Sequence, residues 1–297
     1  MTDERVIGVD LGGTGIKLGL YDREGQCHGE RAIATPQPST PDAVIAAIAG
    51  AVADLDPSGN ARAIGVGMPG PADAAGRVAR IAINLSGWVD VPLADRLEAL
   101  TGRPVAIAND ANCAGLGELW RGAGRGCRDA ILLTLGTGVG GAIILDGRLF
   151  TGRTGAAGEL GLISLDPAGP ACNSGNAGSL ERFCSIGAVQ RRFGCDPLEL
   201  SRRVETGDER ALAAWADYGR TLAVGIASLV YVLTPEVVVL GGGLSAAAPY
   251  FLPALTEELE QRVLPISREG MHVVVAALGN DAGRVGAAKL AWDHLAE

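Results

Sequence analysis

A glycine-rich segment near the start of the chain, VIGVDLGGTGIKLGLYD at residues 6–22, constrains the fold more than any other feature. It reads as an apolar strand, a tight turn and a second strand, since glycine permits the backbone angles and close approach that such a turn needs. The turn consists of Gly12, Gly13 and Thr14. Asp10 ends the first strand, where a carboxylate beside bare amides suits a bound anion only if a cation lies between them.

The same pattern returns as LTLGTGVGGAIIL at residues 133–145, in which Thr134 aligns with Asp10. The second turn consists of Gly136, Thr137 and Gly138. Repeated hairpins indicate two similar lobes that each present backbone amides to one cleft, although two unrelated hairpins would give the same pattern. Unhindered N–H groups and threonine hydroxyls can both donate to phosphate oxygens, so the two turns predict a phosphate site.

Short apolar runs alternate with amphipathic segments along the chain, which is typical of an α/β fold. Strands are expected at residues 6–10, 16–21, 31–35, 63–67, 105–108, 130–135, 142–145, 236–240 and 272–276. Helices are expected at 41–55, 93–100 and 111–121, between about 185 and 233, and from about 284. A glycine-rich region up to about residue 178 is expected to be irregular.

Composition excludes several classes of protein. A length of 297 residues allows about two domains, and a formal charge of −9 disfavours nucleic-acid or anionic-membrane binding. The apolar uncharged run between Arg220 and Glu236 contains Gly225 and Pro235 and is shorter than the ~20 residues of a spanning helix. The first strand begins near residue 5, so neither a signal peptide nor a DNA-binding module is expected, and the location is expected to be cytoplasmic.

Six cysteines occur without any C-x-x-C pair. They are Cys27, Cys113, Cys127, Cys172, Cys184 and Cys195. We expect free thiols in a reducing compartment.

Two further glycine motifs are ambiguous. A G-x-G-x-x-G match at residues 65–70 is unsuited to a dinucleotide, because Pro69 and Pro71 lack N–H donors and no amphipathic helix follows. The run VVVLGGGLS could pack a nucleoside against bare backbone or could form only a strand-to-helix turn. Its glycines are Gly241, Gly242 and Gly243. The chain has no Walker A motif.

Taken in order, these motifs resemble those of the ROK family of sugar kinases, in the glucokinase and hexokinase branch of the actin-like superfamily. The resemblance runs from about residue 5 to 290 through VDLGGT, GMPGPAD, NLSGW, IANDANCAGLGE, LTLGTGVGG, GAAGELG, GSLE and VVLGGG. It implies an α/β fold with two actin-like (ribonuclease H-like) lobes around a central cleft. The expected lobes are 1–118 plus 284–297, and 119–283.

The resemblance also assigns roles to individual residues. It implies that Asp110 is the catalytic base, whereas residue type alone favours a helix N-cap. It implies that Asn109, Glu159 and Glu181 bind sugar hydroxyls, with Asn84 a weaker candidate, and that residues 241–243 lie on the adenosine side. Glutamates are usually solvated surface charges, but the glycines around Glu159 and Glu181 favour a pocket. Trp88 is expected to pack in the core and not to stack on a ligand.

One family motif is broken. Many members bind a structural zinc through the histidine of G-E-x-G-H and three cysteines of C-x-C-G-x-x-G-C. Here the corresponding residues are Leu162, Cys172, Ser174 and Ser179, so one ligand of four remains and no bound zinc is expected. An alternative site made of Cys172, Cys184 and Cys195 would lack a fourth donor. Leu162 also removes a donor near the anomeric side of the sugar, which favours broader hexose acceptance or weaker affinity.

The expected function is ATP- and Mg²⁺-dependent phosphorylation of a hexose, glucose first, at the 6-hydroxyl. Asp10 is expected to position hydrated Mg²⁺ while the two turns hold the phosphates. Alternatives are an N-acetylhexosamine or fructose kinase, a sugar-responsive repressor and a non-catalytic sugar-binding protein. The expected partners are the sugar, ATP and further copies of the chain, with neither nucleic acid nor membrane.

Overall fold

The computed structural model describes residues 4–82 and 84–296, and the chain divides into two compact units. Unit 1 comprises Met1–Gly126, Ile143–Gly158 and Ala277–Glu297, and unit 2 comprises Cys127–Ala142 and Glu159–Ala276. The lobe boundaries expected from the sequence, after residues 118 and 283, both fall inside helices that the structure keeps whole in unit 1.

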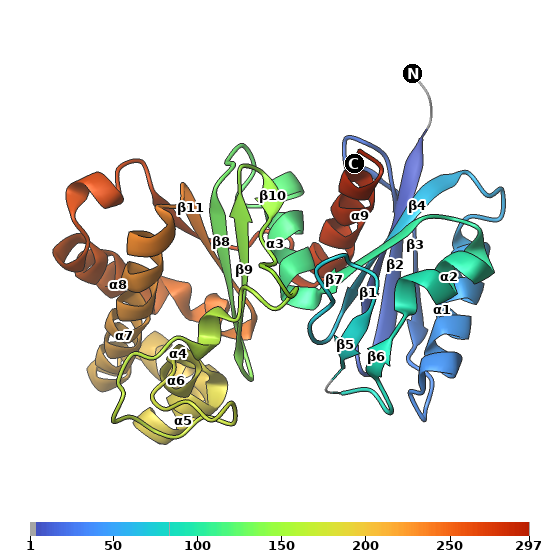
Figure 1. Ribbon diagram of the computed structural model, residues 1–297. Helices are drawn as coiled ribbons and strands as arrows, with labels where there is room; N and C mark the ends of the chain where they lie inside the picture. Colours follow the sequence, from blue (N-terminus) through green and yellow to red (C-terminus); the bar gives the residue numbers. More distant parts are fainter. Residues whose placement is uncertain (1–3, 83, 297) are drawn as a thin grey trace. The chain divides into compact units, whose positions relative to one another are not determined.

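Unit 1 is built on a five-stranded sheet with the order β3-β2-β1-β4-β7 (Figure 1). Its strands are β1 (Arg5–Leu11), β2 (Gly15–Tyr21), β3 (Cys27–Ala34), β4 (Ala61–Met68) and β7 (Val105–Asn109). β1, β2 and β3 form an antiparallel meander, whereas β4 and β7 run parallel to β1. A short separate pair, β5 (Ala79–Ile81) and β6 (Val89–Val91), was not expected from the sequence.

Helices cover both faces of this sheet. They are α1 (Pro41–Leu55), α2 (Leu93–Thr101), α3 (Asp110–Arg121) and α9 (Ala282–His294). The side chain of Thr40 caps α1 by accepting the Ala43 N–H, and Val44, Ile45 and Ile48 then recur on its buried face. Figure 1 shows α1 and α2 on one face of the sheet and α9 on the other.

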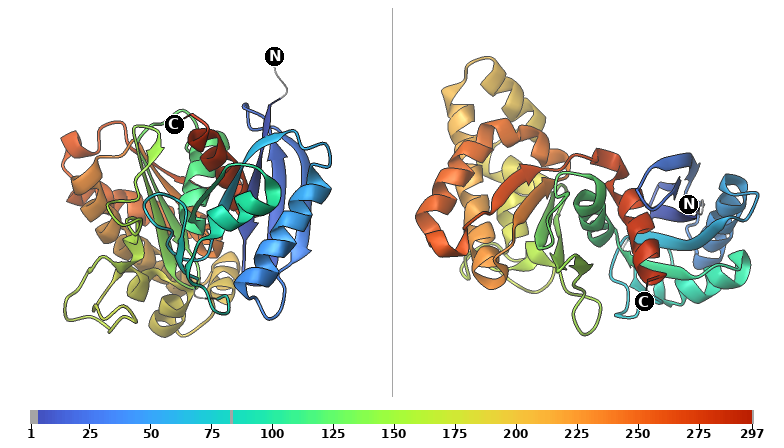
Figure 2. Two further views of the ribbon diagram at one scale, coloured as in Figure 1. Left: turned by 45° about the vertical axis from the view of Figure 1, so that its right-hand side comes forward. Right: turned by 90° about the horizontal axis from the view of Figure 1, so that it is seen from above.

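Glycines let α9 lie very close to the sheet. A Cβ on Gly8 would stand 2.0 Å from the Arg284 carbonyl oxygen, and one on Gly65 would stand 1.8 Å from that of Ala287. The views of Figure 2 agree that α9, in red, crosses the blue strands of unit 1. Gly65 therefore serves helix packing, which explains the first glycine of the G-x-G-x-x-G match without a dinucleotide.

Unit 2 repeats the strand order of unit 1. Its sheet has the order β10-β9-β8-β11-β12. The hairpin β8–β9, which contains the second glycine turn, occupies the same place in this order as β1–β2 does in unit 1. The strands are β8 (Ala130–Leu135), β9 (Val139–Leu145), β10 (Arg148–Leu149), β11 (Val237–Gly241) and β12 (His272–Val275). The end of β9 and all of β10 belong to the stretch Ile143–Gly158, which clusters with unit 1 although these strands pair within this sheet. The expectation of two similar α/β halves is confirmed by this repeated order.

The helices of unit 2 are α4 (Leu180–Cys184), α5 (Ile186–Phe193), α6 (Pro197–Glu205), α7 (Glu209–Leu233) and α8 (Ala248–Arg262). α7 and α8 pack side by side (Figure 1), since a Cβ on Gly219 would come within 2.3 Å of the Phe251 carbonyl oxygen. Trp215, Tyr218 and Phe251 form a buried aromatic cluster between them. Within the described residues, no helix is both long and apolar enough to span a bilayer.

Candidate functional site

The first glycine turn leaves two amides unused. The turn closes through a 2.9 Å bond from the Gly12 N–H to the Gly15 carbonyl oxygen. Thr35 then fixes its outer side, because its hydroxyl donates to Gly12 O at 2.7 Å and its N–H donates to Thr14 O at 3.1 Å. Within residues 4–82 and 84–296, the Gly13 and Thr14 amides donate no hydrogen bond. They are free to bind an anion.

Asp10 lies beside this turn in a crowded, charged environment. It is the cross-strand partner of Lys17, and a Cβ on Gly283, in the first turn of α9, would come within 2.9 Å of its carboxyl carbon. Burial raises the pKa of Asp10, Lys17 lowers it, the neighbouring Asp110 carboxylate raises it and Arg284 lowers it, with a net rise. A cation bound here would offset both the burial and the second carboxylate.

Asn109 and Asp110 join β7 to α3, and the structure corrects the N-cap assignment. Asn109 is the cap, since its side-chain oxygen accepts from the N–H groups of Ala111 at 2.9 Å and Asn112 at 3.4 Å. Its amide nitrogen donates to Gly70 O at 3.4 Å. Asp110 is the first residue of the helix and is exposed. The need for a cap at this helix therefore does not explain Asp110.

The carboxylate of Asp110 is tuned by its surroundings. Desolvation raises its pKa, hydrogen bonds from the Ala111 N–H and from Asn109 lower it, and the net result is a raised pKa. A raised pKa makes a carboxylate a better proton acceptor than a fully solvated one. Asn84 also belongs to this region, because a Cβ on Gly13 would lie 3.4 Å from the Asn84 Cβ. Unit 1 thus gathers both aspartates, both asparagines and the first turn.

The second turn is tied to a carboxylate of unit 2. Gly136 N–H donates to Gly138 O at 2.9 Å, and Glu181, in the first turn of α4, accepts the Val139 N–H at 3.0 Å. A Cβ on Gly138 would stand 2.5 Å from the Glu181 Oε2. Thr137 is exposed at the tip of the turn. The predicted sugar-binding glutamate therefore lies directly beside the predicted phosphate turn.

The third glycine cluster meets the same turn. Gly241 ends β11 as the partner of Thr134, the residue that corresponds to Asp10. Gly242 has a φ of +82°, and a Cβ there would lie 2.4 Å from the Leu135 carbonyl oxygen. No atom lies within 4 Å of the Cβ position of Gly243. Glycine is required at position 242, and the backbone beyond it borders open space.

Glu159 and Leu162 flank a short 3-10 helix, Leu160–Leu162. Glu159 is exposed, and Leu162 is half-buried. The segment lies against the second turn, because a Cβ on Gly161 would stand 1.9 Å from the Val139 carbonyl oxygen. Glu181 and the 3-10 helix that follows Glu159 are therefore both close to the start of β9.

The loop that corresponds to the family's zinc motif is held by hydrogen bonds. The Cys172 thiol donates to the Ser179 hydroxyl at 2.7 Å, and the Asn176 amide donates to Leu162 O at 2.9 Å. All six cysteines are free thiols, as expected. In the described part of the chain, no three His, Cys, Asp or Glu side chains are grouped as metal ligands. Burial raises the pKa of Cys184 to about 12, which keeps its thiol protonated and disfavours the alternative three-cysteine site.

Sequence reasoning missed the residues that surround Asp10. Lys17 could have been found, because a hairpin with a short turn places it opposite Asp10. Gly283 and Arg284 come from a helix far along the chain and become neighbours only when α9 packs on β1. Trp88 is 1% exposed and its indole N–H donates to Ser39 O at 2.9 Å, which confirms its expected packing role.

Comparison with known proteins identifies this arrangement. A family model described as ROK family matches residues 6–294. The chain is 35% identical to a glucokinase of Thermotoga maritima over 98% of either protein. A ROK hexokinase from Thermus thermophilus is similar with a TM-score of 0.88 and 36% identity, over 98% of this chain and 99% of that one. A ROK glucokinase from Streptomyces griseus, solved with glucose and AMPPNP, gives 0.77 and 33% over 97% and 99%.

These similarities confirm the expected fold class, an α/β fold with two actin-like (ribonuclease H-like) lobes. Because the family model spans nearly the whole chain and the relatives share about a third of its residues from end to end, the chain belongs to the ROK family, in its glucokinase and hexokinase branch.

Proposed function

We propose that this protein transfers the γ-phosphate of ATP to the 6-hydroxyl of a hexose, with glucose as the first substrate to test. The glucokinase relatives and the solved complex with glucose and AMPPNP support this reaction. In the proposed arrangement Asp110 accepts the hydroxyl proton as the oxygen attacks phosphorus. The turns of residues 12–14 and 136–138 hold the phosphates, and residues 241–243 border the nucleoside.

The side chains that we propose for sugar binding are ones that can hydrogen-bond to hydroxyl groups. Asn109, Glu159 and Glu181 are the main candidates, and Asn84 is a weaker one. The exposed position of Glu159 and the partial exposure of Glu181 leave their carboxylates able to accept sugar hydroxyls. Asn109 already uses its side chain to cap α3, so we propose that it contributes only its remaining hydrogen-bonding capacity.

The residues around Asp10 fit a magnesium ion held through water. The carboxylate of Asp110 raises the pKa of the buried Asp10 carboxylate, and unused amides lie beside Asp10. These groups supply the hard oxygen donors and the anion contacts that a Mg²⁺–nucleotide pair needs. When bound, Mg²⁺ would neutralise charge that develops on the transferring phosphoryl group. Asp10 itself would orient the water shell of the ion, and the Gly13 and Thr14 amides would hold phosphate oxygens.

The observation that carries the proposal is the state of Asp110. It is accessible, it has a raised pKa, it begins the helix without capping it, and it lies near the carboxylate of Asp10. The test is Asp110→Asn, which keeps the shape and removes the proton acceptor. A coupled assay for ADP release should show kcat lowered by roughly 10²- to 10⁴-fold. Calorimetry should find glucose affinity within a few-fold of the parent protein, and unchanged turnover would reject Asp110 as the base.

The proposal also covers substrate breadth. Leu162 presents a methyl-bearing wall in the segment next to Glu159, where a hydrogen-bond donor would help to select one sugar. We expect kcat/KM for mannose, fructose and 2-deoxyglucose within about 100-fold of glucose, because a leucine wall has no polar group that a missing or inverted hydroxyl would leave unpaired. The same panel, extended to N-acetylglucosamine and N-acetylmannosamine, separates the alternative kinases. Strong exclusion of every sugar but glucose would contradict the role given to Leu162.

A further inference from the structure

Unit 1 contains a pocket of about 290 Å³ beside the edge strand β7 that the proposed reaction does not use. Its walls come from residues 72–76, β7, α3, the β10 segment and the end of α9. Of the residues proposed above for sugar or nucleotide, only Asn109 lines it. The volume is close to the lower end of the range for ligand pockets, about 300–1,000 Å³, and is far larger than a single water requires.

Asn112 is the pocket residue that most needs a ligand. It is 3% exposed, and its buried side-chain oxygen has no hydrogen-bond partner in the structure. Its backbone N–H is used by the helix cap, but the described residues offer its side-chain amide no hydrogen bond. An unpaired buried amide costs stability, so it needs an explanation. Hydroxyl groups complement a primary amide, because both can donate and accept.

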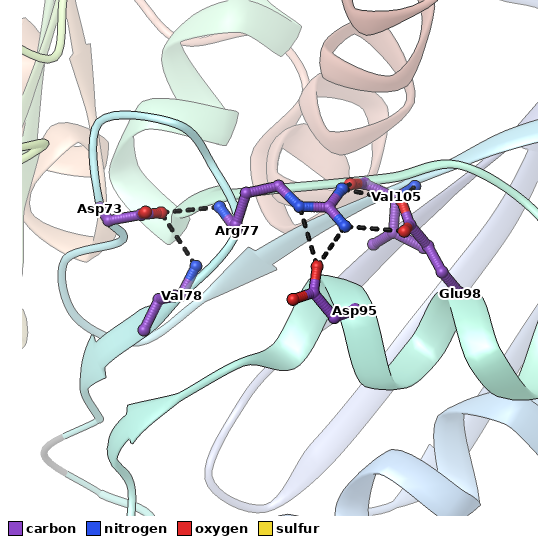
Figure 3. Close-up of polar contacts among 6 residues, drawn as sticks. All are labelled: Asp73, Arg77, Val78, Asp95, Glu98 and Val105. Atoms are coloured by element: carbon purple, nitrogen blue, oxygen red, sulfur yellow. Dashed lines mark hydrogen bonds and ion pairs between the residues drawn. The ribbon is translucent and has the colours of Figure 1, made fainter.

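The wall formed by residues 72–76 is held by hydrogen bonds, which favours a preformed pocket. Asp73 accepts the N–H groups of Arg77 at 2.7 Å and Val78 at 2.9 Å (Figure 3). The Arg77 guanidinium then donates to both oxygens of Glu98 at 2.7 Å and to Val105 O at 2.9 Å. Loop 72–76 is thus fastened to both α2 and β7. Both backbone N–H groups bond to the same Asp73 oxygen, Oδ1, so the carboxylate is held in place and keeps its charge.

Arg148 is the lining residue that can bind an anion. Asp293, the other acid that lines the pocket, is paired with Lys289. Arg148 lines the pocket from β10 and is exposed, and the part of the chain that the structure describes offers it no ion pair. His294 lines the same pocket. Leu149 and Leu290 add apolar wall against which a carbon chain can pack.

We propose that this pocket binds a small polyol that carries one anionic group, a phosphate or a carboxylate. Its hydroxyls pair with the amide of Asn112, its carbon chain packs on Leu149 and Leu290, and its anionic group lies near Arg148. Asn109 lines this pocket, caps α3 and is also one of the proposed sugar-binding residues, so a polyol bound here would lie next to a residue of the proposed sugar site.

The test uses three six-carbon probes that differ in one group: sorbitol 6-phosphate, gluconate and sorbitol. Each is titrated by calorimetry into the full-length protein at saturating glucose, so that the proposed sugar site is already filled. We expect at least one anionic probe to bind about fivefold or more tightly than sorbitol, and the tighter anion identifies the source. Equal affinity for all three probes, or no binding, would overturn the proposal. Binding that is seen only when glucose is left out would overturn it too, because the probe would then occupy the proposed sugar site.

Two variants and one control locate the binding. Arg148→Gln should remove the preference for the anion, whereas Arg153→Gln, a change at an exposed arginine outside the pocket lining, should keep it. Asn112→Leu should weaken the anionic probe at least tenfold and leave kcat/KM for glucose within about twofold. It should also raise Tm of the ligand-free protein by roughly 2 °C, because an unpaired amide is removed. Unchanged probe affinity in Arg148→Gln or Asn112→Leu, or a lowered Tm in the latter, would contradict the assignment.

Discussion

The two glycine hairpins share a scaffold and differ in where the acid stands. In unit 1 the carboxylate of Asp10 is on the strand itself, directly before the turn, and the turn amides of Gly13 and Thr14 are unused. In unit 2 that strand position is Thr134, and the carboxylate of Glu181 arrives from the start of α4 to accept an N–H next to the turn. The carboxylate beside the glycine turn thus comes from the hairpin itself in unit 1 and from a neighbouring helix in unit 2.

We propose that this difference separates a contact with metal and phosphate in unit 1 from a contact with hydroxyl groups in unit 2. A carboxylate at the strand end is fixed by the sheet and suits a metal ion that must keep one position. A carboxylate on a helix terminus can adjust and suits hydroxyl groups that vary between substrates. The repeat in the sequence therefore predicts the shared backbone, and we propose that the residues that depart from the repeat carry the chemistry.

The largest expected effect separates the two strand positions. Asp10→Asn should lower kcat/KM for ATP by roughly 10²- to 10³-fold, because charge stabilisation of the phosphates is lost with the carboxylate. Thr134→Val, the matched change in unit 2, should cost no more than about fivefold. Steady-state kinetics across a magnesium titration measures both. Equal losses of kcat/KM in the two variants would contradict the proposed difference between Asp10 and Thr134.

The second prediction compares two carboxylates that accept backbone N–H groups. Glu118 is 1% exposed and accepts three backbone N–H groups, from Ala123, Ala277 and Leu278. These residues lie in unit 1 close to its boundaries at Gly126 and Ala277, so Glu118 holds both chain segments in place. Glu118→Gln should lower the free energy of unfolding by about 2–4 kcal/mol, since an amide NH₂ would face donors that need an acceptor.

Glu181→Gln is the control, because Glu181 is half-buried and accepts one backbone N–H. It should cost about 1 kcal/mol or less. Urea unfolding of the two variants and the parent protein measures both effects. A Glu118→Gln protein as stable as the parent would show that these three bonds do not hold the segments.

Much of the scaffold could be predicted from the sequence, because its signals are local. The helix Pro41–Leu55 and the strand Ala130–Leu135 were expected with these bounds, since a capping threonine, a proline and a strong apolar pattern mark them. The pair β5–β6 was missed, because three-residue strands with exposed side chains such as Val89 have no period to detect. Strands this short form only where the rest of the fold presents them to each other.

The site was only partly predictable, for the same reason. The turns, Asp110 and Glu181 stand in local motifs, and the structure places the turns after β1 and β8, Asp110 at the start of α3 and Glu181 in α4. Adjacent polar residues cannot be told apart by type, so Asn109 was not recognised as the cap of α3. Gly283 reaches Asp10 only because Gly8 and Gly65 allow α9 to approach the sheet. Such contacts depend on packing between distant segments, which a local pattern does not contain.

The third prediction contrasts a buried and an exposed Arg–Asp pair. In unit 1, burial alone would raise the pKa of Asp56, but bonds from the N–H groups of Ala61 and Asn60 and from Arg103 lower it. Because the pKa of Asp56 is lower in the folded than in the unfolded protein, its carboxylate stabilises the fold at pH values above the unfolded pKa of 3.8. This stabilisation is lost as the pH falls through the pKa of the folded protein. Asp56→Asn should therefore cost about 1–3 kcal/mol at pH 7.

The difference between Asp56→Asn and the parent protein should shrink as the pH is lowered past 3.8, because the parent carboxylate then becomes protonated too. Asp208, in unit 2, accepts from Arg203 in a more exposed setting, so Asp208→Asn should cost clearly less. Urea unfolding at several pH values measures these changes. A loss that stays constant down to acid pH would show that shape, and not charge, sets the role of Asp56.

The smallest expected effect tests how Glu181 is placed by the second turn. An added Cβ at Gly138 would meet the Glu181 carboxylate at 2.5 Å, whereas one at Gly136 would meet nothing closer than Gly138 O at 4.0 Å. The end of a glutamate side chain can move aside cheaply, so Gly138→Ala should leave Tm almost unchanged. The displaced carboxylate should nevertheless raise KM for the sugar by roughly tenfold, because orientation of a hydroxyl contact is lost. The matched control, Gly136→Ala, should keep KM for the sugar within about twofold of the parent value. A similar KM in both variants would contradict the role of Glu181 in sugar binding, and the two hairpins would then differ in structure but not in this function.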